Sequence, residues 1–461
     1  MFSYQQAPLG HPMLEHFLLD PNYKNLNHGS FGTYPAVVRD QLRRFQDMAE
    51  ARPDEFIRYT YPTFLDASRA AMAKYLNAPV NEIVFVKSAT AAINTVLRNL
   101  TYCPRDVIIY FSTIFDACEK TIISITETTS LEARKVDSTF PITHNEIVRR
   151  FLDTLQKAKS EGFNVRICLF DTIVSLPGVR FPFERLVDIC REQGVLSCID
   201  GAHGVGHIPL DLSKLGADFF VSISHKWLYN PRGCSVFHVP IRNQHLIRTT
   251  IPTSHGFIPK DSPAQPYPND RLSLASKSAF EILFERVAVT DDASYLTIPA
   301  ALEFRREILG GENRIFAYIE GIARDGGDLV AAILGTEVLT EPNDGTIDQS
   351  EIRRCAFANV RLPVTIHDPK CSGGSKSISA YMAASHWPIV TMSQASEVVS
   401  WFQTQLITEF STYASVFIHN GALWVRLSGQ TYLELEDFKW LAEVLKELSE
   451  RVGGSDVWKL K

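Results

Sequence analysis

The chain lacks the features of membrane-spanning and exported proteins. No apolar run reaches the roughly 18 residues that a transmembrane helix needs. The N-terminal residues M-F-S-Y-Q-Q-A-P-L-G-H-P also lack the charged and then apolar order of a signal peptide. We therefore expect an intracellular, cytoplasmic protein that has no membrane among its partners.

Basic clusters and paired cysteines are missing as well. The 46 basic and 52 acidic residues are well mixed and give a net charge of −6, so we expect no positive surface for nucleic acid. The eight cysteines include no C-x-x-C pair, and several lie in apolar runs that are typical of strands. Buried thiols are therefore predicted in place of disulfides or a zinc site, and no metal is predicted.

Glycine-rich nucleotide loops and repeats are absent too. No G-x-G-x-x-G joins the first predicted strand to its helix, which argues against a nicotinamide-binding protein. The sequence shows no internal repeat and no low-complexity tract. It does contain 461 residues with 45% hydrophobic content, which is enough for two or three domains with a large core.

Strand and helix patterns alternate in the first half of the chain. Strands are predicted at 82–86, 106–111, 165–170, 195–199 and 219–223, and helices at 91–100, 118–125, 146–159 and 183–193. Short β-rich runs between longer periodic ones are typical of βαβ units. The predicted fold class is therefore α/β, with a large, doubly wound and mostly parallel sheet.

The pattern changes after residue 290. Helices are predicted at 296–308, 314–334 and 436–451, a strand at 424–427, and a surface loop rich in Gly, Ser and Lys at 368–377. This combination predicts a smaller α+β domain. We divide the chain into an N-terminal segment (1–35), a large α/β domain (36–290) and a small C-terminal domain (291–461).

Chemically useful side chains follow two neighbouring predicted strands. Asp200 comes directly after the run 195–199, and Lys226 follows the run 219–223. The carboxyl ends of parallel strands meet at the edge where open α/β sheets bind ligands. An aspartate that pairs with a pyridinium nitrogen and a lysine that forms a Schiff base are the protein's part in pyridoxal 5'-phosphate (PLP) chemistry. The sequence therefore predicts a PLP enzyme.

Each of these residues also has a structural interpretation. Lys226 could be a solvated surface charge, but it is flanked by apolar residues where an idle lysine would be costly to bury. Asp200 could cap a turn. His203 could pack against the cofactor ring, orient Asp200, or be an ordinary core histidine bonded to backbone. The run Ser88-Ala89-Thr90 lies between a strand and a helix and could bind phosphate at the helix N-terminus, or be a simple N-cap.

The motifs together resemble the aminotransferase class V family of fold-type I PLP enzymes. The resemblance is closest to the branch with isopenicillin N epimerase-like proteins, ergothioneine-pathway C–S lyases and loline-type cyclases. It covers nearly the whole chain and rests on L-N-H-G-S-F-G (26–32), F-S-T-I-F-D-A-C-E-K (111–120), D-T-I-V-S-L-P-G (171–178), D-G-A-H (200–203), S-H-K-W (224–227) and V-R-L-S (425–428). It implies a homodimer with sites near the interface.

The resemblance also implies a role for individual residues. Lys226 would carry the cofactor, Asp200 would pair with its ring nitrogen, and His203 would support that acid. Further cofactor contacts would come from Ala89, Thr90, Ser222 and His225 at the phosphate, Ser175 near the phenolic oxygen and Phe115 stacked on the ring. Arg426 would bind the substrate carboxylate rather than lie on a solvated strand face, and Asn27, Gly29 and Ser30 would lie over the substrate.

Two positions depart from the pattern of similar proteins. Phe115 stands where relatives with lyase activity have a tyrosine, so stacking survives but a phenolic proton donor is lost. The segment Ala288-Val289-Thr290-Asp291 differs from the small-Thr-x-Asp pattern with which relatives reach the partner's phosphate. A cross-subunit role for Thr290 is therefore left open.

The predicted reaction starts with loss of the α-proton of an amino acid, with Lys226 as the base. We expect side-chain elimination, replacement or cyclisation to follow, as in a C–S lyase or an alkaloid-type cyclase of specialised metabolism. Four alternatives stay open at this point. These are an epimerase, a cysteine desulfurase that uses Cys371, an aminotransferase, and a non-catalytic binding protein that retains the fold.

Overall fold

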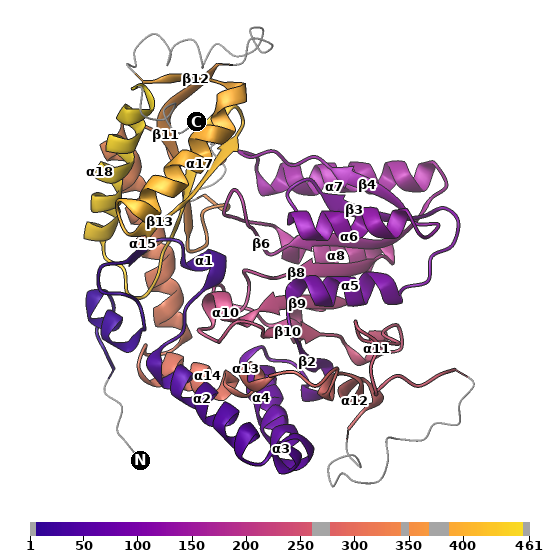
Figure 1. The fold of residues 1–461 in the computed structure, drawn as a ribbon. Helices are drawn as coiled ribbons and strands as arrows, with labels where there is room; N and C mark the ends of the chain where they lie inside the picture. The colour runs from indigo at the N-terminus through magenta and orange to yellow at the C-terminus, as the bar shows by residue number, and fades with distance from the viewer. Residues whose placement is uncertain (1–5, 261–276, 343–349, 368–386, 455–461) are drawn as a thin grey trace.

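The computed structural model of the protein describes residues 6–260, 277–342, 350–367 and 387–454. Among the four β-sheets of these residues, the two larger ones organise the fold, and short helices and loops lie between them (Figure 1). The loop predicted at 368–377 and the residue Cys371 lie outside the described part of the chain.

The larger sheet has seven strands in the order β2-β10-β9-β8-β5-β3-β4. Its strands are β2 (Ile83–Val86), β3 (Asp106–Phe111), β4 (Glu132–Val136), β5 (Asn164–Asp171), β8 (Leu196–Asp200), β9 (Phe219–Ile223) and β10 (Ser235–His238). All neighbouring strands are parallel except at β10, which runs antiparallel to β2 and β9. The predicted α/β class with a mostly parallel sheet is confirmed.

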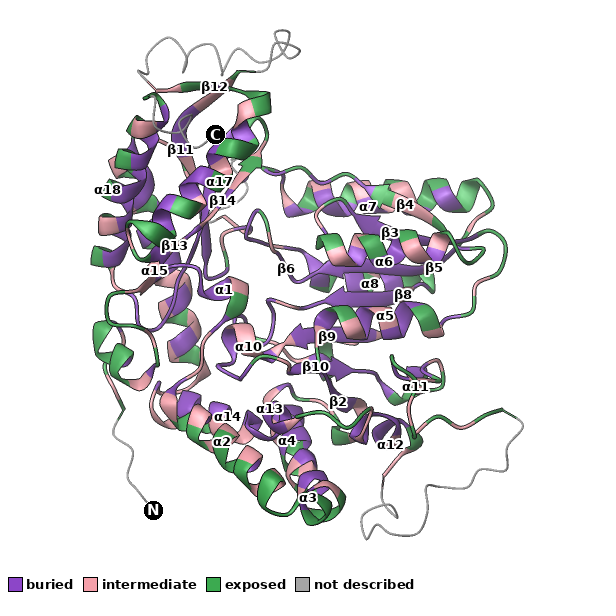
Figure 2. Cartoon of the chain, in the orientation of Figure 1, coloured by how far each residue is buried: buried purple, intermediate pink, exposed green. Residues whose placement is uncertain are grey.

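Amphipathic helices cover this sheet. The connecting helices are α5 (Ala89–Asn99), α6 (Asp116–Thr126), α7 (His144–Ser160) and α8 (Phe183–Gln193). In α8 the apolar residues recur every three or four positions, and Phe183, Leu186, Val187 and Cys190 are buried. Strand β3 is buried at every residue, as expected for a parallel strand that helices cover on both faces (Figure 2).

The smaller sheet has four strands in the order β12-β11-β15-β14. These are β11 (Phe357–His367), β12 (Ile389–Thr391), β14 (Ser415–His419) and β15 (Ala422–Ser428), accompanied by helices α15 (Glu312–Leu334), α17 (Met392–Thr408) and α18 (Leu435–Val452). The sequence predicted α15, α18 and the core of β15 but not β11. The domain boundaries at residues 35 and 290 stay predictions.

The N-terminal segment is attached to the C-terminal half of the chain. Strand β1 (Lys24–Asn25) pairs in parallel with β13 (Thr412–Tyr413), and the Ser428 amide donates to the Leu26 carbonyl at 2.9 Å. These contacts hold the short helix α1 (His28–Phe31) against α10 (Ser224–Trp227), the helix that carries Lys226 (Figure 1).

Neither a membrane helix nor a metal cluster is found in the described ranges. No helix there is both long and apolar enough to cross a bilayer. No group of three or more His, Cys, Asp or Glu side chains there could hold a metal ion.

Candidate active site

Three strand ends bring the acidic residues and the lysine together. Asp171 ends β5 and Asp200 ends β8, and the two residues are direct partners in the register of these parallel strands. Helix α10 follows β9 without a linker, so Lys226 reaches the same edge of the sheet. The site therefore lies at the carboxyl edge, where the sequence predicted it.

Lys226 lies in a polar but partly buried position. Its Nζ is 3.0 Å from His203 Nε2. Burial lowers the pKa of Lys226 to about 8, although the negative charges of Asp200 and Asp171 oppose that shift. A sizeable fraction of the side chain is therefore a neutral amine near physiological pH, which is the form that attacks a carbonyl.

Asp200 is buried and held by two donors. The Ala202 amide donates to Oδ1 at 3.0 Å, and the Cys118 thiol donates to Oδ2 at 3.4 Å. Burial raises the pKa of Cys118, so the thiol keeps its proton as a donor. This arrangement orients the carboxylate but leaves it able to accept a further hydrogen bond.

Asp171 begins the motif D-T-I-V-S-L-P-G, and no role was predicted for it from the sequence. Burial and the neighbouring Asp200 charge raise the pKa of the Asp171 carboxyl well above its usual range, so we expect a neutral acid there. Its Oδ2 is buried and has no hydrogen-bond partner among the residues that the structure describes. Of the two adjacent carboxyls, Asp200 is therefore the one suited to hold a cation.

His203 contacts Trp227 and Lys226, and not Asp200, which was its expected partner. Its ring nitrogens lie within hydrogen-bond distance of Trp227 Nε1 and Lys226 Nζ, and no bond to Asp200 is seen. Burial lowers the pKa of His203 well below its usual value, so the ring is neutral. Direct support of Asp200 by His203 therefore has no contact behind it in this structure.

The predicted phosphate residues fall into two groups. Ala89 and Thr90 begin α5, whose N-cap Ser88 accepts a hydrogen bond from the Ala91 amide, so two first-turn N–H groups remain for an anion. Ser222, by contrast, donates to the Gly201 carbonyl and accepts from the Val205 amide at 2.9 Å. Its hydroxyl proton is already used, so the structure does not support Ser222 as a phosphate ligand.

Helix α10 supplies better candidates for the phosphate. The hydroxyl of Ser224 and Nδ1 of His225 are buried and have no hydrogen-bond partner within the described ranges. Ser222, two residues earlier, was the predicted serine, although the S-H-K-W motif contains both Ser224 and His225.

Arg426 gathers the predicted substrate residues around its guanidinium. Nη1 donates to the Ser175 carbonyl at 2.6 Å, and Nη2 donates to Asn27 Oδ1 at 3.1 Å and to the Ser30 hydroxyl at 2.7 Å. The group lies over the Phe357 ring at 4.5 Å. Burial lowers its pKa to about 10, so Arg426 stays charged at neutral pH.

Gly29 is explained by packing. A Cβ atom there would lie 2.4 Å from the Phe357 ring and 2.9 Å from Trp227. The Gly29 amide also donates to the Ser428 hydroxyl at 3.2 Å. Gly29 therefore allows α1 to approach the site closely, and Phe357, on the unpredicted strand β11, is part of the site's wall.

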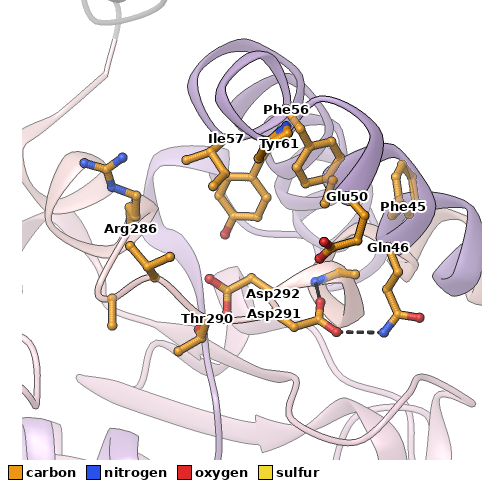
Figure 3. Close-up of a pocket in the computed structure, with 15 residues that line it drawn as sticks. Phe45, Gln46, Glu50, Phe56, Ile57, Tyr61, Arg286, Thr290, Asp291 and Asp292 are labelled. Atoms are coloured by element: carbon orange, nitrogen blue, oxygen red, sulfur yellow. Dashed lines mark hydrogen bonds between the residues drawn. The ribbon is translucent and has the colours of Figure 1, made fainter.

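The stacking role of Phe115 stays a prediction, and the cross-subunit role of Thr290 stays open. Phe115 precedes α6 by one residue and is 53% exposed. Thr290 donates to Asp292 Oδ1 at 3.0 Å, within its own chain. Thr290 and Asp292 line a cavity of about 530 Å³, where they face Phe56 and Tyr61 (Figure 3).

Comparisons with known proteins identify the family. Residues 58–255 match the model of aminotransferase class V. An L-cysteine desulfhydrase-like protein, lolT1, of Epichloe uncinata is 38% identical over 97% of this chain and 97% of its own. The chain belongs to the aminotransferase class V family. The resemblance inferred from the motifs is therefore confirmed.

Further similarities agree with this class V assignment. Hercynylcysteine sulfoxide lyase of Schizosaccharomyces pombe is 28% identical over 95% of this chain and 97% of its own. The solved structure of a cystine C–S lyase in complex with cysteine persulfide has a TM-score of 0.66 at 16% identity and covers 93% of this chain and 98% of that one. The fold is PLP fold type I, and PLP is the cofactor of this class V enzyme.

The residues at the sheet edge fit this cofactor. Buried polar atoms without partners cluster there, and among the described residues they include Asp171 Oδ2, Ser224 Oγ, His225 Nδ1 and Arg426 Nε. Unpaired buried polar groups are rare and indicate a missing partner. Lys226 would carry the cofactor, Asp200 would meet its ring nitrogen, and the start of α5 with Ser224 and His225 would hold its phosphate.

Replacing Arg426 by lysine should weaken substrate binding. Lysine keeps the charge but loses the planar fork that binds a carboxylate through two hydrogen bonds and stacks on Phe357. We expect KM for the amino-acid substrate to rise about 10- to 100-fold, with a smaller change in kcat. Steady-state kinetics would measure this, with Arg361→Lys on β11 as the matched control. An unchanged KM in Arg426→Lys would exclude Arg426 as the carboxylate ligand.

Proposed function

We propose that the protein is a PLP-dependent lyase that removes a side-chain group, foremost a sulfur group, from an amino acid. Replacement of that group or ring closure by an internal amine would be variants of the same chemistry. The observation that carries the proposal is a partly neutral Lys226 amine whose pKa responds to the charges of both Asp200 and Arg426. Similarity over nearly the full chain to two proteins named for carbon–sulfur chemistry supports the same reaction.

The side chains divide the work of such a reaction. Arg426 fixes the substrate carboxylate, which orients the α-hydrogen, and Lys226 Nζ accepts that proton. Asp200 holds positive charge at the ring nitrogen, and the bound cofactor supplies the electron sink for the carbanion. Phe115 has no hydroxyl to donate, so we assign the proton carried by Lys226 Nζ to the departing side chain.

Mass spectrometry of products from a panel of amino acids tests the proposal. Cysteine, cystine and cysteine S-conjugates should yield the free sulfur compound together with a keto acid and ammonia. A cyclic product that has lost only the leaving group would indicate the cyclase variant. Recovery of substrate with inverted configuration would favour an epimerase instead, and conversion of the cofactor to its amine form would favour an aminotransferase.

We also propose that two copies of the chain form the working enzyme. Val289, next to Thr290, is an apolar side chain with 80% exposure that lines the cavity drawn in Figure 3. Contiguous apolar surface is typical of an interaction site, and Phe56, Ile57 and Ala288 line the same cavity as Val289. Light scattering should give twice the 51.8 kDa mass of the chain. A stable monomer with full activity would contradict the dimer.

A further inference from the structure

Trp227 donates a hydrogen bond to His203, the histidine that contacts Lys226. Its indole Nε1 lies 3.2 Å from Nδ1 of His203. An indole N–H can only donate, so Nδ1 of His203 must be the acceptor. A neutral imidazole that accepts at one nitrogen carries its proton on the other, which places the proton of His203 on Nε2.

The protonated nitrogen of His203 faces the lysine. Nε2 is 3.0 Å from Lys226 Nζ. A neutral amine has a lone pair that can accept from Nε2–H, whereas an ammonium has three donors and no acceptor. In the ammonium form, the N–H donors of Lys226 would therefore face the Nε2–H donor of His203, and no hydrogen bond could form between them. The hydrogen-bond direction set at Trp227 thus favours the amine form of Lys226.

The indole cannot turn to release this bond. Trp227 is 1% exposed and stacks on His207 with ring centroids 3.8 Å apart. His207 is itself held at both nitrogens, since the Ala356 amide donates to Nε2 at 2.7 Å and Nδ1 donates to the His203 carbonyl at 2.9 Å. Arg305 donates to the Trp227 carbonyl at 2.8 Å and holds the backbone.

We propose that Trp227 is a positioning residue that holds His203 in its Nε2–H tautomer and thereby keeps Lys226 in the amine form. This effect on the protonation of Lys226 acts before catalysis, because the amine is the form that captures the cofactor's aldehyde. It rests on the role proposed for Lys226. The other charged and titratable groups around Lys226 are present in both tautomers of His203; they are Asp171, Asp200, His28, His207, His225 and Arg426.

The tautomer can be observed directly in cofactor-free protein. Nitrogen-15 NMR of ring-labelled histidine should show His203 protonated at Nε2, with the signal assigned by its loss in His203→Gln. In Trp227→Phe the indole donor is gone, so Nδ1–H should become populated. Wild-type His203 that carries its proton on Nδ1, or on both nitrogens, would overturn the proposal whether or not any variant folds.

The pH dependence of cofactor capture gives a second measurement. The rate at which cofactor-free protein turns yellow with added PLP should rise with pH as Lys226 loses its proton. In Trp227→Phe the midpoint should move up by about one pH unit, the size expected for one lost hydrogen bond. Trp401→Phe, at a buried tryptophan on α17, is the matched control and should keep the wild-type midpoint.

The two proposals fail in different ways. If the wild-type protein and Trp227→Phe both capture PLP with the same pH midpoint, the role of Trp227 is refuted and the proposed function is left intact. Failure of the wild-type protein to capture PLP at all would refute the proposed role of Lys226 itself. A general packing defect in Trp227→Phe would lower thermal stability without moving the midpoint, and that result also counts against the proposal.

Discussion

Replacing Lys226 by alanine should abolish turnover and leave a protein that does not hold PLP covalently. Alanine removes both the amine that binds the cofactor and the base that takes the α-proton. Loss of a positioned base alone costs about 10²- to 10⁴-fold in rate, so we expect a loss at or beyond the upper end of that range. The surface lysine Lys120 is a suitable control, since its side chain is 70% exposed and Lys120→Ala should keep full activity.

The position of the covalent bond can be mapped independently of activity. Borohydride reduction of the yellow wild-type protein, followed by peptide mapping, should place a pyridoxyl mass on Lys226 and nowhere else. Because burial lowers the pKa of Lys226 to about 8, covalent loading should become faster as the pH rises through that value. A pyridoxyl mass on another lysine would overturn the assignment of the site.

Replacing Asp200 by asparagine should cause the second large loss. Asparagine has the same shape and can still accept from the Ala202 amide, but it has no charge to keep a ring nitrogen protonated. Removing one preorganised electrostatic partner costs about 10²- to 10³-fold in kcat, and we expect a loss of that size. Single-turnover kinetics of α-proton loss would measure it without interference from product release.

The neighbouring carboxyl provides a matched control for Asp200. Asp171 is the register partner of Asp200, is equally buried, and has a pKa raised so far that its carboxyl is already neutral. Asp171→Asn therefore changes little in charge. We expect kcat of Asp171→Asn to be at least about ten times the kcat of Asp200→Asn. The reverse ranking would show that Asp171, and not Asp200, faces the ring nitrogen.

The large sheet was predictable from local patterns. The predicted bounds of β3, α8 and β9 match the structure, because buried parallel strands read as continuous apolar runs and amphipathic helices repeat every three or four residues. Strand β11 was missed because Pro363 interrupts its pattern, and its pairing with β15 shifts register between Arg361 and Thr365. Because β11 was not predicted, Phe357 was not among the predicted site residues.

Most residues of the candidate site could also be predicted from the sequence. The order of phosphate loop, Asp200 and Lys226 along the chain was enough to predict the cofactor, since parallel strands always present their carboxyl ends at one edge. The structure favours Ser224 over Ser222 as a phosphate ligand for a reason that no spacing reveals. The hydroxyl of Ser222 is used by the backbone of the D-G-A-H turn.

The sequence by itself determined the family, the fold class, the cofactor and the lysine that would bear it, because these depend on local order and on motif residues. Only the tertiary structure decided which atoms meet. It joined Arg426 to Asn27 and Ser30 across the chain and turned His203 toward Trp227 and Lys226 instead of Asp200. It also left Asp171 Oδ2 without a hydrogen-bond partner in the described part of the chain. Hydrogen-bond directions depend on donors that distant segments supply, and one-dimensional spacing does not contain that information.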